Sequence, residues 1–253
     1  MVLDHFQLAG KVAIVSGCDT GLGQGMARAL AQAGADVVGI NVSAPTETAQ
    51  QVQAQGRRFL DLRADLSDIG CIEGLVKQAT QWGGHVDILV NNAGIIRRED
   101  AIKFSEKDWD DVLNLNLKSV FFFSQAVARQ YLAQKNGGKI INVASMLSFQ
   151  GGVRVPSYTA SKSGVMGITR LMANEWAGQR INVNAIAPGY MATNNTAPLR
   201  ADADRSAAIL ERIPAGRWGT PDDLAGPVVF LASPASDYVN GYTIAVDGGW
   251  LAR

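Results

Sequence analysis

Short apolar runs rich in β-branched residues alternate with longer amphipathic stretches along the whole chain, and this alternation limits the fold more than any other feature. Several of the short runs are almost continuously apolar, which is typical of strands covered on both faces. Strands and helices in alternation predict a parallel sheet with right-handed crossovers. We therefore expect an α/β fold, doubly wound, with helices on both faces of the sheet.

The expected elements follow one another without a long linker or an internal repeat. The strands are expected at Lys11–Ser16, Asp36–Asn41, Arg57–Leu62, Val86–Val90, Lys139–Ala144, Ile181–Ile186 and Thr243–Val246. The helices are expected at Gly21–Ala33, Thr46–Gln55, Ser67–Trp82, Ser105–Ala133, Ser157–Ala177 and Pro221–Ala232. Thr220 and Pro221 supply an N-cap and a first-turn proline for the last helix.

One segment breaks the alternation. Tyr190–Trp218 is polar and irregular, with a helical patch over Ala201–Arg212. We interpret residues 190–218 as a substrate lid within a single dinucleotide-binding domain, 1–253. A surface excursion with no role in binding is the alternative.

Length and composition agree with one large domain and argue against several functions. Lysine plus arginine equals aspartate plus glutamate, at 23 each, so the chain lacks the basic stripe of a nucleic-acid binder. No stretch approaches the roughly 20 apolar residues that span a bilayer, and the first residues lack a signal-peptide pattern. Cys18 and Cys71 are isolated from each other and from histidine, so no metal site is expected. We expect a cytoplasmic protein without nucleic-acid or membrane partners.

A glycine-rich turn follows the first expected strand and opens the first helix. Its sequence, S-G-C-D-T-G-L-G, runs from Ser16 to Gly23. Glycine permits the tight turn and lets the backbone approach a pyrophosphate, while the helix N-terminus offers free N–H groups. A purely structural turn would also contain glycine, so the context of the motif matters. The residues expected to hold a dinucleotide here are Gly17, Asp19, Thr20, Gly21, Leu22 and Gly23.

The second strand ends at Asn41, where this kind of fold places the residue that binds the adenosine ribose. Asparagine repels a 2′-phosphate less than an acid does. However, no arginine or lysine lies in Asn41–Gln55, so a 2′-phosphate lacks an evident partner, and we favour NAD over NADP. Asp65 and Leu66, past the third strand, are candidates to hold the adenine; for Asp65, a helix cap is the alternative.

Two asparagine motifs follow. Asn91-Asn92-Ala93-Gly94 ends the fourth strand, where the small residues would let a ring or ribose lie against the backbone, so Asn92, Ala93 and Gly94 are expected at the cofactor. Bracing of neighbouring strands by these side chains is the alternative. Asn116 lies inside the long helical stretch, although asparagine is a poor helix former. It predicts either a local break that holds a water in a proton path or simple tolerance.

A serine, a tyrosine and a lysine form the most specific pattern. Tyr158 and Lys162 are four residues apart at the start of a helix, so they share one face, and Ser145 ends the preceding strand. A tyrosine is a poor base near neutrality, but an adjacent ammonium, together with the positive nicotinamide ring, would favour the phenolate and lower its pKa. Tyr158 would exchange a proton with a hydroxyl or carbonyl oxygen, Ser145 would bind that oxygen, and Lys162 would hold the nicotinamide ribose.

These motifs, together with Pro188-Gly189, resemble those of the short-chain dehydrogenase/reductase family over the whole chain. The resemblance implies a seven-stranded Rossmann-type sheet, a homotetramer and a bound NAD(P). It places a catalytic tetrad on Asn116, Ser145, Tyr158 and Lys162, and it adds Pro188, Gly189, Met191 and Thr193 to the cofactor site. The chain departs from the family pattern at Ser16, where threonine is usual, and at Asn41, where NAD-using members generally have aspartate.

Within that family, the loops after the strands resemble those of NAD(H)-dependent members that interconvert keto-deoxy sugar acids in hexuronate and pectin breakdown. A sugar-acid carboxylate favours an arginine partner. Arg97, Arg98 and Arg154 are candidates, with Arg154 first by position; each is otherwise a surface charge. The other expected pocket residues are Gln150, Tyr190, Met191, Thr193 and Asn194.

Two rival functions are compatible with the same sequence. One is a dehydrogenase or reductase of this family acting on a polyol, a steroid or a 3-oxoacyl thioester. The other is a non-catalytic NAD-binding sensor. The spacing of Ser145, Tyr158 and Lys162 argues against the sensor, because binding alone needs no proton donor.

Overall fold

The computed structural model describes residues 1–253. Its centre is one seven-stranded sheet in the order β3-β2-β1-β4-β5-β6-β7, and every neighbouring pair is parallel. The expected doubly wound α/β fold is confirmed. The strands are β1 (Val12–Ser16), β2 (Asp36–Asn41), β3 (Phe59–Arg63), β4 (Ile88–Asn91), β5 (Gly138–Val143), β6 (Ile181–Pro188) and β7 (Thr243–Val246).

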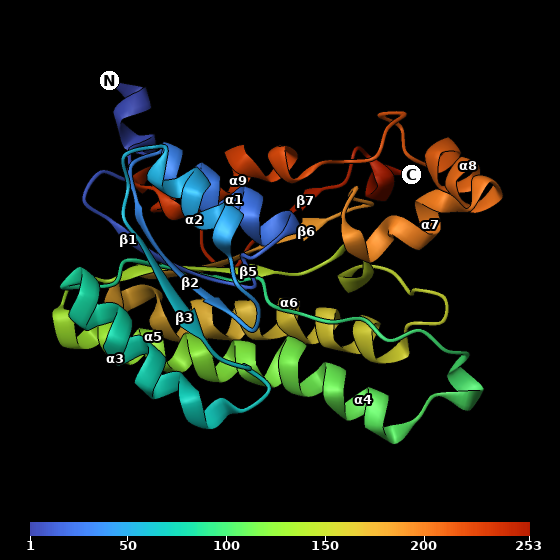
Figure 1. The fold of residues 1–253 in the computed structure, drawn as a ribbon, viewed down its shortest axis with the longest axis horizontal. Coiled ribbons are helices and arrows are strands. Elements are labelled where there is room, and N and C mark those ends of the chain that lie inside the picture. The colour runs from blue at the N-terminus through green and yellow to red at the C-terminus, as the bar shows by residue number, and fades with distance from the viewer.

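Helices cover both faces of the sheet (Figure 1). One face carries α1 (Gly21–Gln32), α2 (Thr46–Gln53) and α9 (Ala225–Ala232). The other carries α3 (Ile72–Gly83), α5 (Ser119–Gln134) and α6 (Pro156–Trp176), with α4 (Glu106–Leu113) beside them. Residues 190–218, the segment interpreted as a lid and called the lid below, contain α7 (Ala197–Ala201) and α8 (Ala203–Arg212).

The two faces have separate apolar cores. Along β1, Ala13 and Val15 join the core under α1 and α9, whereas Val12 and Ile14 join the core over α3 and α5. All five β1 residues are buried, because alternate side chains point to opposite faces and both faces are covered. The continuous apolar run in the sequence is explained by this double burial.

The helix boundaries differ from the prediction in three places. The expected helix Pro221–Ala232 opens with a 3₁₀ turn over Pro221–Leu224, so α9 begins only at Ala225. The expected helix Ser105–Ala133 is interrupted by a π-helical turn at Asn114–Lys118, so α4 and α5 are separate. The expected helix Ser67–Trp82 begins as α3 only at Ile72, because a short 3₁₀ turn at Ile69–Cys71 precedes it. Asp68 caps that 3₁₀ turn by accepting a hydrogen bond from the Gly70 N–H.

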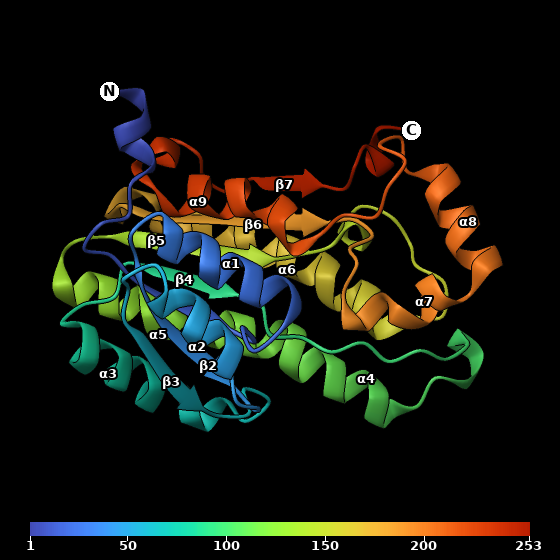
Figure 2. The same cartoon turned by 45° about the horizontal axis from the view of Figure 1, so that its top comes forward.

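The lid lies at the carboxyl end of the sheet, and the chain terminus packs beside it (Figure 2). Trp250, Ile209 and Ile213 share a small apolar cluster with Met146, and Tyr190 and Trp218 pack against it. Arg253 donates a hydrogen bond to the Glu211 carbonyl oxygen, at 2.6 Å. No helix of the structure combines the length and the apolar character needed to cross a membrane.

Candidate active site

The glycine turn lies at the carboxyl end of β1, beside the point where the strand order reverses between β1 and β4. Gly17 has a φ of +63°, and a Cβ there would lie 2.9 Å from the Ala93 Cα. A Cβ on Gly23 would lie 2.1 Å from the Gly17 carbonyl oxygen. The turn therefore requires glycine at both positions, and it presents the first N–H groups of α1 to a pocket, as an anion site needs.

Part-buried hydrogen bonds connect the β1 turn to the end of β4. The Asn92 side-chain amide donates to the carbonyl oxygens of Ser16 (3.0 Å) and Gly17 (2.8 Å). The Ser16 hydroxyl in turn accepts from the N–H groups of Asn92 and Ala93. The side chain of Asn92 therefore braces the turn, which is the alternative that the sequence left open. Serine makes these bonds where the family usually has threonine.

The Asn41 side chain holds the glycine turn at the edge of the pocket. It is 3% exposed, and its Oδ1 accepts a hydrogen bond from the Cys18 N–H at 2.7 Å. Its Nδ2 faces the Cys18 sulfur. Asn41 thus braces the glycine turn, and its contact with the ribose stays a prediction.

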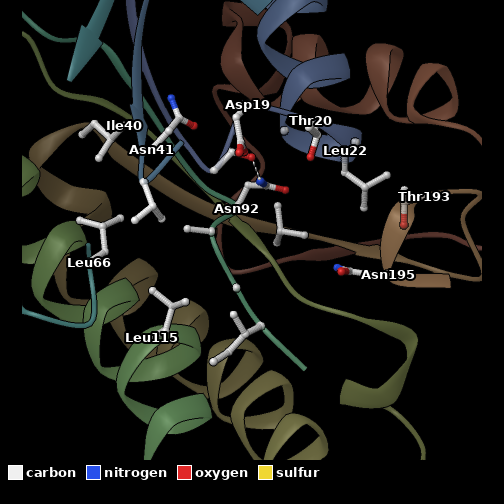
Figure 3. Close-up of a pocket in the computed structure, with 18 of the residues that line it drawn as sticks. Asp19, Thr20, Leu22, Ile40, Asn41, Leu66, Asn92, Leu115, Thr193 and Asn195 are labelled. Atoms are coloured by element: carbon white, nitrogen blue, oxygen red, sulfur yellow. Dashed lines mark hydrogen bonds between the residues drawn. The ribbon is translucent and has the colours of Figure 1, made fainter. Parts of the chain in front are cut away.

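A single pocket collects most of the residues that the sequence predicted for a cofactor (Figure 3). It runs along the ends of β1, β2, β4 and β5. The predicted residues that line it are Gly17, Asp19, Thr20, Gly21, Leu22, Gly23, Asn41, Asp65, Leu66, Asn92, Ala93, Gly94, Tyr158, Lys162 and Thr193. Asp65 also accepts from the Ser67 N–H, so it closes a local turn while its other oxygen has no partner within the chain.

The sequence missed other lining residues, namely Ile40, Val42, Ala64, Ile95, Leu115, Val143 and Asn195. Each of these stands within a few residues of a strand end, a π turn or the lid. Their side chains are mostly apolar and carry no motif. The ends of the predicted strands were the signal that would have found them, because parallel strands end at one edge.

Tyr158 and Lys162 line this pocket, and Ser145 lies against Tyr158. The Lys162 Nζ lies 5.7 Å from the centroid of the Tyr158 ring and donates to the Val143 carbonyl oxygen at 2.6 Å. Ser145 ends the β5 region, 6% exposed, and its hydroxyl accepts from the Leu147 N–H. A second serine, Ser148, donates to the Lys162 carbonyl oxygen at 2.6 Å and so fixes the β5–α6 loop on α6.

The pKa values of this pair are set mainly by burial. Burial raises the pKa of Tyr158, and hydrogen bonding with Ser145 and the charge of Arg98 oppose that rise. Burial lowers the pKa of Lys162 to about 8. The expected lowering of the Tyr158 pKa by the ammonium is wrong for the chain alone, because desolvation of the phenolate dominates. The phenol is therefore protonated at neutral pH and prepared to donate.

Asn116 occupies the centre of the π-helical turn and is fully buried. Its amide Nδ2 donates to the Ile95 carbonyl oxygen and its Oδ1 accepts from the Ile95 N–H, both at 2.9 Å. Nδ2 also lies 3.4 Å from the Ser161 hydroxyl of α6. Asn116 thus joins the β4 loop to the helix that carries Tyr158. π turns of this kind are often found at functional sites.

The three candidate arginines differ in their partners. Arg154 has a φ of +62° and forms ion pairs with Glu99 (3.4 Å) and Asp100 (2.9 Å). Arg97 faces Asp108 at 3.3 Å. Arg154 is therefore paired with two acids in the structure, and its role as the carboxylate anchor stays a prediction.

Arg98 has no acidic partner among the ion pairs of the structure. It donates to the Asn195 carbonyl oxygen at 3.2 Å, and its charge is near enough to Tyr158 to lower the pKa of the phenol. Arg98 therefore connects the β4 loop with Asn195 near Tyr158, and it has further donors without a partner.

Several predicted lid and loop residues lie outside the main pocket. The Tyr190 ring packs on Trp218 and Trp250, with centroids 5.5 Å and 4.8 Å away, and Met191 is 4% exposed within the core. Pro188 ends β6 buried, and a Cβ on Gly189 would lie 2.6 Å from the Asp247 Cα. Gln150 accepts from Arg212 of α8 at 3.3 Å. Tyr190, Met191 and Gln150 hold the lid together more than they line the site.

A glycine turn on the first strand, a Ser–Tyr–Lys set and an asparagine in a π turn around one pocket define a class of protein. A family model described as enoyl-(acyl carrier protein) reductase matches residues 17–251. The chain belongs to the short-chain dehydrogenase/reductase family.

Individual relatives are more specific. The chain is 75% identical to the 2-dehydro-3-deoxy-D-gluconate 5-dehydrogenase of Escherichia coli, with all of both chains covered. It is 54% identical to the enzyme of that name from Bacillus subtilis, with 99% of this chain and 98% of the relative covered. A solved structure of a gluconate 5-dehydrogenase from Burkholderia cenocepacia, in complex with NADP and tartrate, is 38% identical with a TM-score of 0.94, and both chains are fully covered.

A second solved structure is more similar in sequence. It comes from Agrobacterium tumefaciens, is provisionally assigned as a 2-deoxy-D-gluconate 3-dehydrogenase, and contains NADP. It is 56% identical to this chain with a TM-score of 0.93, and it covers 99% of this chain and 100% of its own.

Proposed function

We propose that this protein is a nicotinamide-coenzyme-dependent oxidoreductase that interconverts 2-dehydro-3-deoxy-D-gluconate and its 2,5-diketo form, with NAD(H) as the preferred coenzyme. The observation that carries the substrate is 75% identity over the full length to a relative of that activity. The observation that supports the chemistry is the meeting of Tyr158, Lys162 and Ser145 at one end of a long pocket.

The residues of the pocket fit a dinucleotide. The glycine turn lines the pocket and places the first N–H groups of α1 there, where a phosphate would accept hydrogen bonds from them. Asp65, Leu66 and Ala64 line the pocket beyond β3, where an adenine would lie. Gly94 and Ile95 line it towards Tyr158. When bound, the coenzyme supplies the hydride acceptor or donor that the side chains lack.

The chain's own residues handle the proton and the oxygen. In the reducing direction, carbon 5 receives the hydride and neutral Tyr158 gives its proton to the carbonyl oxygen, so the C=O group becomes a CH–OH group. In the oxidising direction, the tyrosine takes the hydroxyl proton back. Ser145 donates a hydrogen bond to the same oxygen. Hydrogen bonding between Ser145 and Tyr158 also lowers the pKa of the phenol and so favours the phenolate that forms.

Lys162 has a second task besides electrostatics. Its amine is 4% exposed, has one protein acceptor at Val143, and faces the pocket beside Tyr158. An ammonium has three donors. The two that remain would hold the hydroxyls of the nicotinamide ribose and so place the ring against the substrate.

We propose Arg98 as the anchor of the substrate carboxylate. A guanidinium binds a carboxylate through two parallel hydrogen bonds, and Arg98 is the candidate without a competing acid. Its contact with Asn195 places the anchor under the lid. A carboxylate bound there would join the β4 loop to the lid over the reacting carbon.

We also propose that the chain works as a homotetramer. The helices α4, α5 and α6 carry half-exposed apolar side chains, among them Trp109, Phe122, Leu132 and Leu171. Such a face on one layer of helices suits an interface between copies. Light scattering on the purified protein tests this: a monomer at micromolar concentration would contradict it.

The function is tested by following NADH absorbance with 2-dehydro-3-deoxy-D-gluconate and NAD⁺, and with the diketo acid and NADH. A 3-oxoacyl thioester, a neutral polyol and a steroid are the comparison substrates. We expect turnover with the sugar acid to exceed that with the others by at least about 100-fold in kcat/KM. Equal or greater turnover of the thioester would replace the proposal with the acyl-reductase alternative, and coenzyme binding without any turnover would indicate a sensor.

A further inference from the structure

The residue that usually selects the coenzyme is used for another purpose in this chain. Asn41, at the end of β2, is buried and bonded to the backbone N–H of Cys18 in the glycine turn. This bond occupies the Asn41 Oδ1 and so weakens Asn41 as a partner for the 2′-hydroxyl of an adenosine ribose. The end of β2 nevertheless lines the pocket through Asn41 and Val42, so a ribose bound there needs another partner.

A carboxylate from the facing segment lies at that place. Asp19 stands in the glycine turn, one residue beyond the Cys18 that Asn41 holds, and it lines the same pocket (Figure 3). The Ser43 hydroxyl, two residues past β2, donates to the Asp19 Oδ2. This bond crosses from the β2 end to the β1 turn, so it fixes the carboxylate over the ribose end of the pocket. The Asp19 Oδ1 has no hydrogen bond within the chain.

The charged groups around the pocket do not offset the negative charge of that carboxylate. Among the residues that line the pocket, Lys162 is the one cation, and it lies at the opposite end beside Tyr158. Arg63, at the end of β3, reaches the Val42 carbonyl oxygen at 3.3 Å, but its Nε is bonded to both oxygens of Asp61, at 2.9 Å and 2.8 Å. A 2′-phosphate would thus meet a free carboxylate oxygen and a cation that an acid already neutralises.

We propose that Asp19, oriented by Ser43, is the residue that selects the coenzyme: it accepts the ribose 2′-hydroxyl of NAD(H) and repels the 2′-phosphate of NADP(H). The selecting acid has moved from the end of β2 to the glycine turn, while Asn41 braces that turn. This inference rests on the proposed use of a nicotinamide coenzyme. Solved structures of two relatives contain NADP, so the inference is made for the residues of this chain and is not extended to those relatives.

The test is direct binding, by calorimetry, of NADH and NADPH to the wild-type chain and to Asp19→Asn. The amide still bonds the 2′-hydroxyl but carries no charge. We expect wild-type to bind NADH at least about tenfold more tightly than NADPH, and Asp19→Asn to reduce that ratio by about tenfold or more, chiefly through tighter NADPH binding. An unchanged ratio, or a wild-type chain without preference, would overturn the inference.

Two further variants serve as controls. Asp65→Asn removes the same charge from the same pocket, but at the adenine end, so it should weaken or leave both coenzymes alike and preserve the ratio. Ser43→Ala releases the carboxylate and should lower NADH affinity about threefold, with some loss of discrimination. A fall in the ratio with Asp65→Asn equal to that with Asp19→Asn would reduce the effect to general charge and overturn the specific role.

The outcomes separate this inference from the proposed function. If neither coenzyme binds the wild-type chain, both proposals are wrong. If NADH binds and drives turnover of the sugar acid while Asp19→Asn leaves the ratio intact, the inference alone is wrong. Thermal melting of each variant verifies folding. We expect the variants to fold, because Asp19 is partly exposed and its partner Ser43 is exposed.

Discussion

The two halves of the pocket are built with different kinds of contact. The coenzyme half is held by buried or part-buried side-chain-to-backbone bonds between distant segments, such as Asn92 to Gly17, Asn41 to Cys18 and Asn116 to Ile95. The substrate half is held by exposed contacts of α8: Arg212 lies 4.1 Å from the centroid of the Trp250 ring and donates to Gln150. Buried bonds resist rearrangement, whereas exposed ones contribute about 0–1 kcal/mol each.

This difference shows how one chain can hold a coenzyme in a fixed orientation and still let a substrate enter and leave. The coenzyme must be placed repeatedly in one orientation, so its half is preformed. A substrate must enter and leave, so its half is closed by contacts that break at little free-energy cost. The following predictions probe that division, beginning with the variant that should have the largest effect.

Tyr158→Phe removes the proton donor and leaves the buried bonds of the coenzyme half intact. We expect kcat to fall by about 10³–10⁴-fold while the Kd for NADH changes little, because the lost group acts on the substrate oxygen. Steady-state kinetics and calorimetry measure the two quantities. A near-normal rate would remove Tyr158 from the mechanism.

Lys162→Met separates activity from stability in the same half. The Lys162 ammonium is buried without an acidic partner, and its pKa falls from 10.5 to about 8. Burial of the charge lowers the stability of the wild-type chain by about 3 kcal/mol. The variant avoids this cost but loses the hydrogen bond to Val143, which contributes about 1 kcal/mol, so it should be more stable by about 2 kcal/mol at neutral pH. It should also be inactive. Denaturant unfolding together with the activity assay measures both effects.

The pH dependence of that gain has a fixed sign. Below a pH of about 8, Lys162 is charged in both the folded and the unfolded wild-type chain, so the full cost is present. Between about 8 and 10.5 the unfolded chain holds more protons, so the wild-type stability gains on the variant as the pH rises. A difference that grows with pH over this range would contradict burial as the cause.

Arg98→Ala tests the boundary between the halves. We expect KM for the sugar acid to rise by about 10- to 100-fold, because one charge-assisted pair is lost, with little change for neutral ketones or for NADH affinity. Arg154→Ala is the matched control, since its guanidinium is paired with Glu99 and Asp100, and it should change KM about threefold or less. The reverse order of effects would restore Arg154 as the anchor.

Arg212→Gln should have the smallest effect. It removes the contact with Trp250 and weakens the bond to Gln150, so the lid should open more often. KM for the sugar acid should rise about two- to fivefold, and the lid should become more sensitive to limited proteolysis, without any change in NADH affinity. A change in NADH affinity would show that the two halves are not independent.

The sequence predicted the framework of the fold well, for reasons of periodicity and local chemistry. The bounds of β2 and β7 are as expected, and the glycine turn, Asn116, Ser145, Tyr158 and Lys162 are brought to one region. Apolar runs of strand length, glycines at fixed spacing and a tyrosine one turn before a lysine are local patterns. Such local patterns can be recognised in a sequence without knowing which distant residues pack against them.

What the sequence did not predict depends on partners far along the chain. Whether Asn41 faces a ribose or the Cys18 N–H, and which of Arg97, Arg98 and Arg154 is free of acids, is settled by segments that meet only in the folded chain. The rise in the Tyr158 pKa has the same origin, because desolvation is a property of everything packed around a group.

The sequence by itself determined the order of strands and helices, the edge at which the site is built and the residue types that perform the chemistry. The tertiary structure decided which of those side chains are free to act. Hydrogen bonds and ion pairs between distant residues consume donors and charges, and a side chain already satisfied within the protein is not available to a ligand.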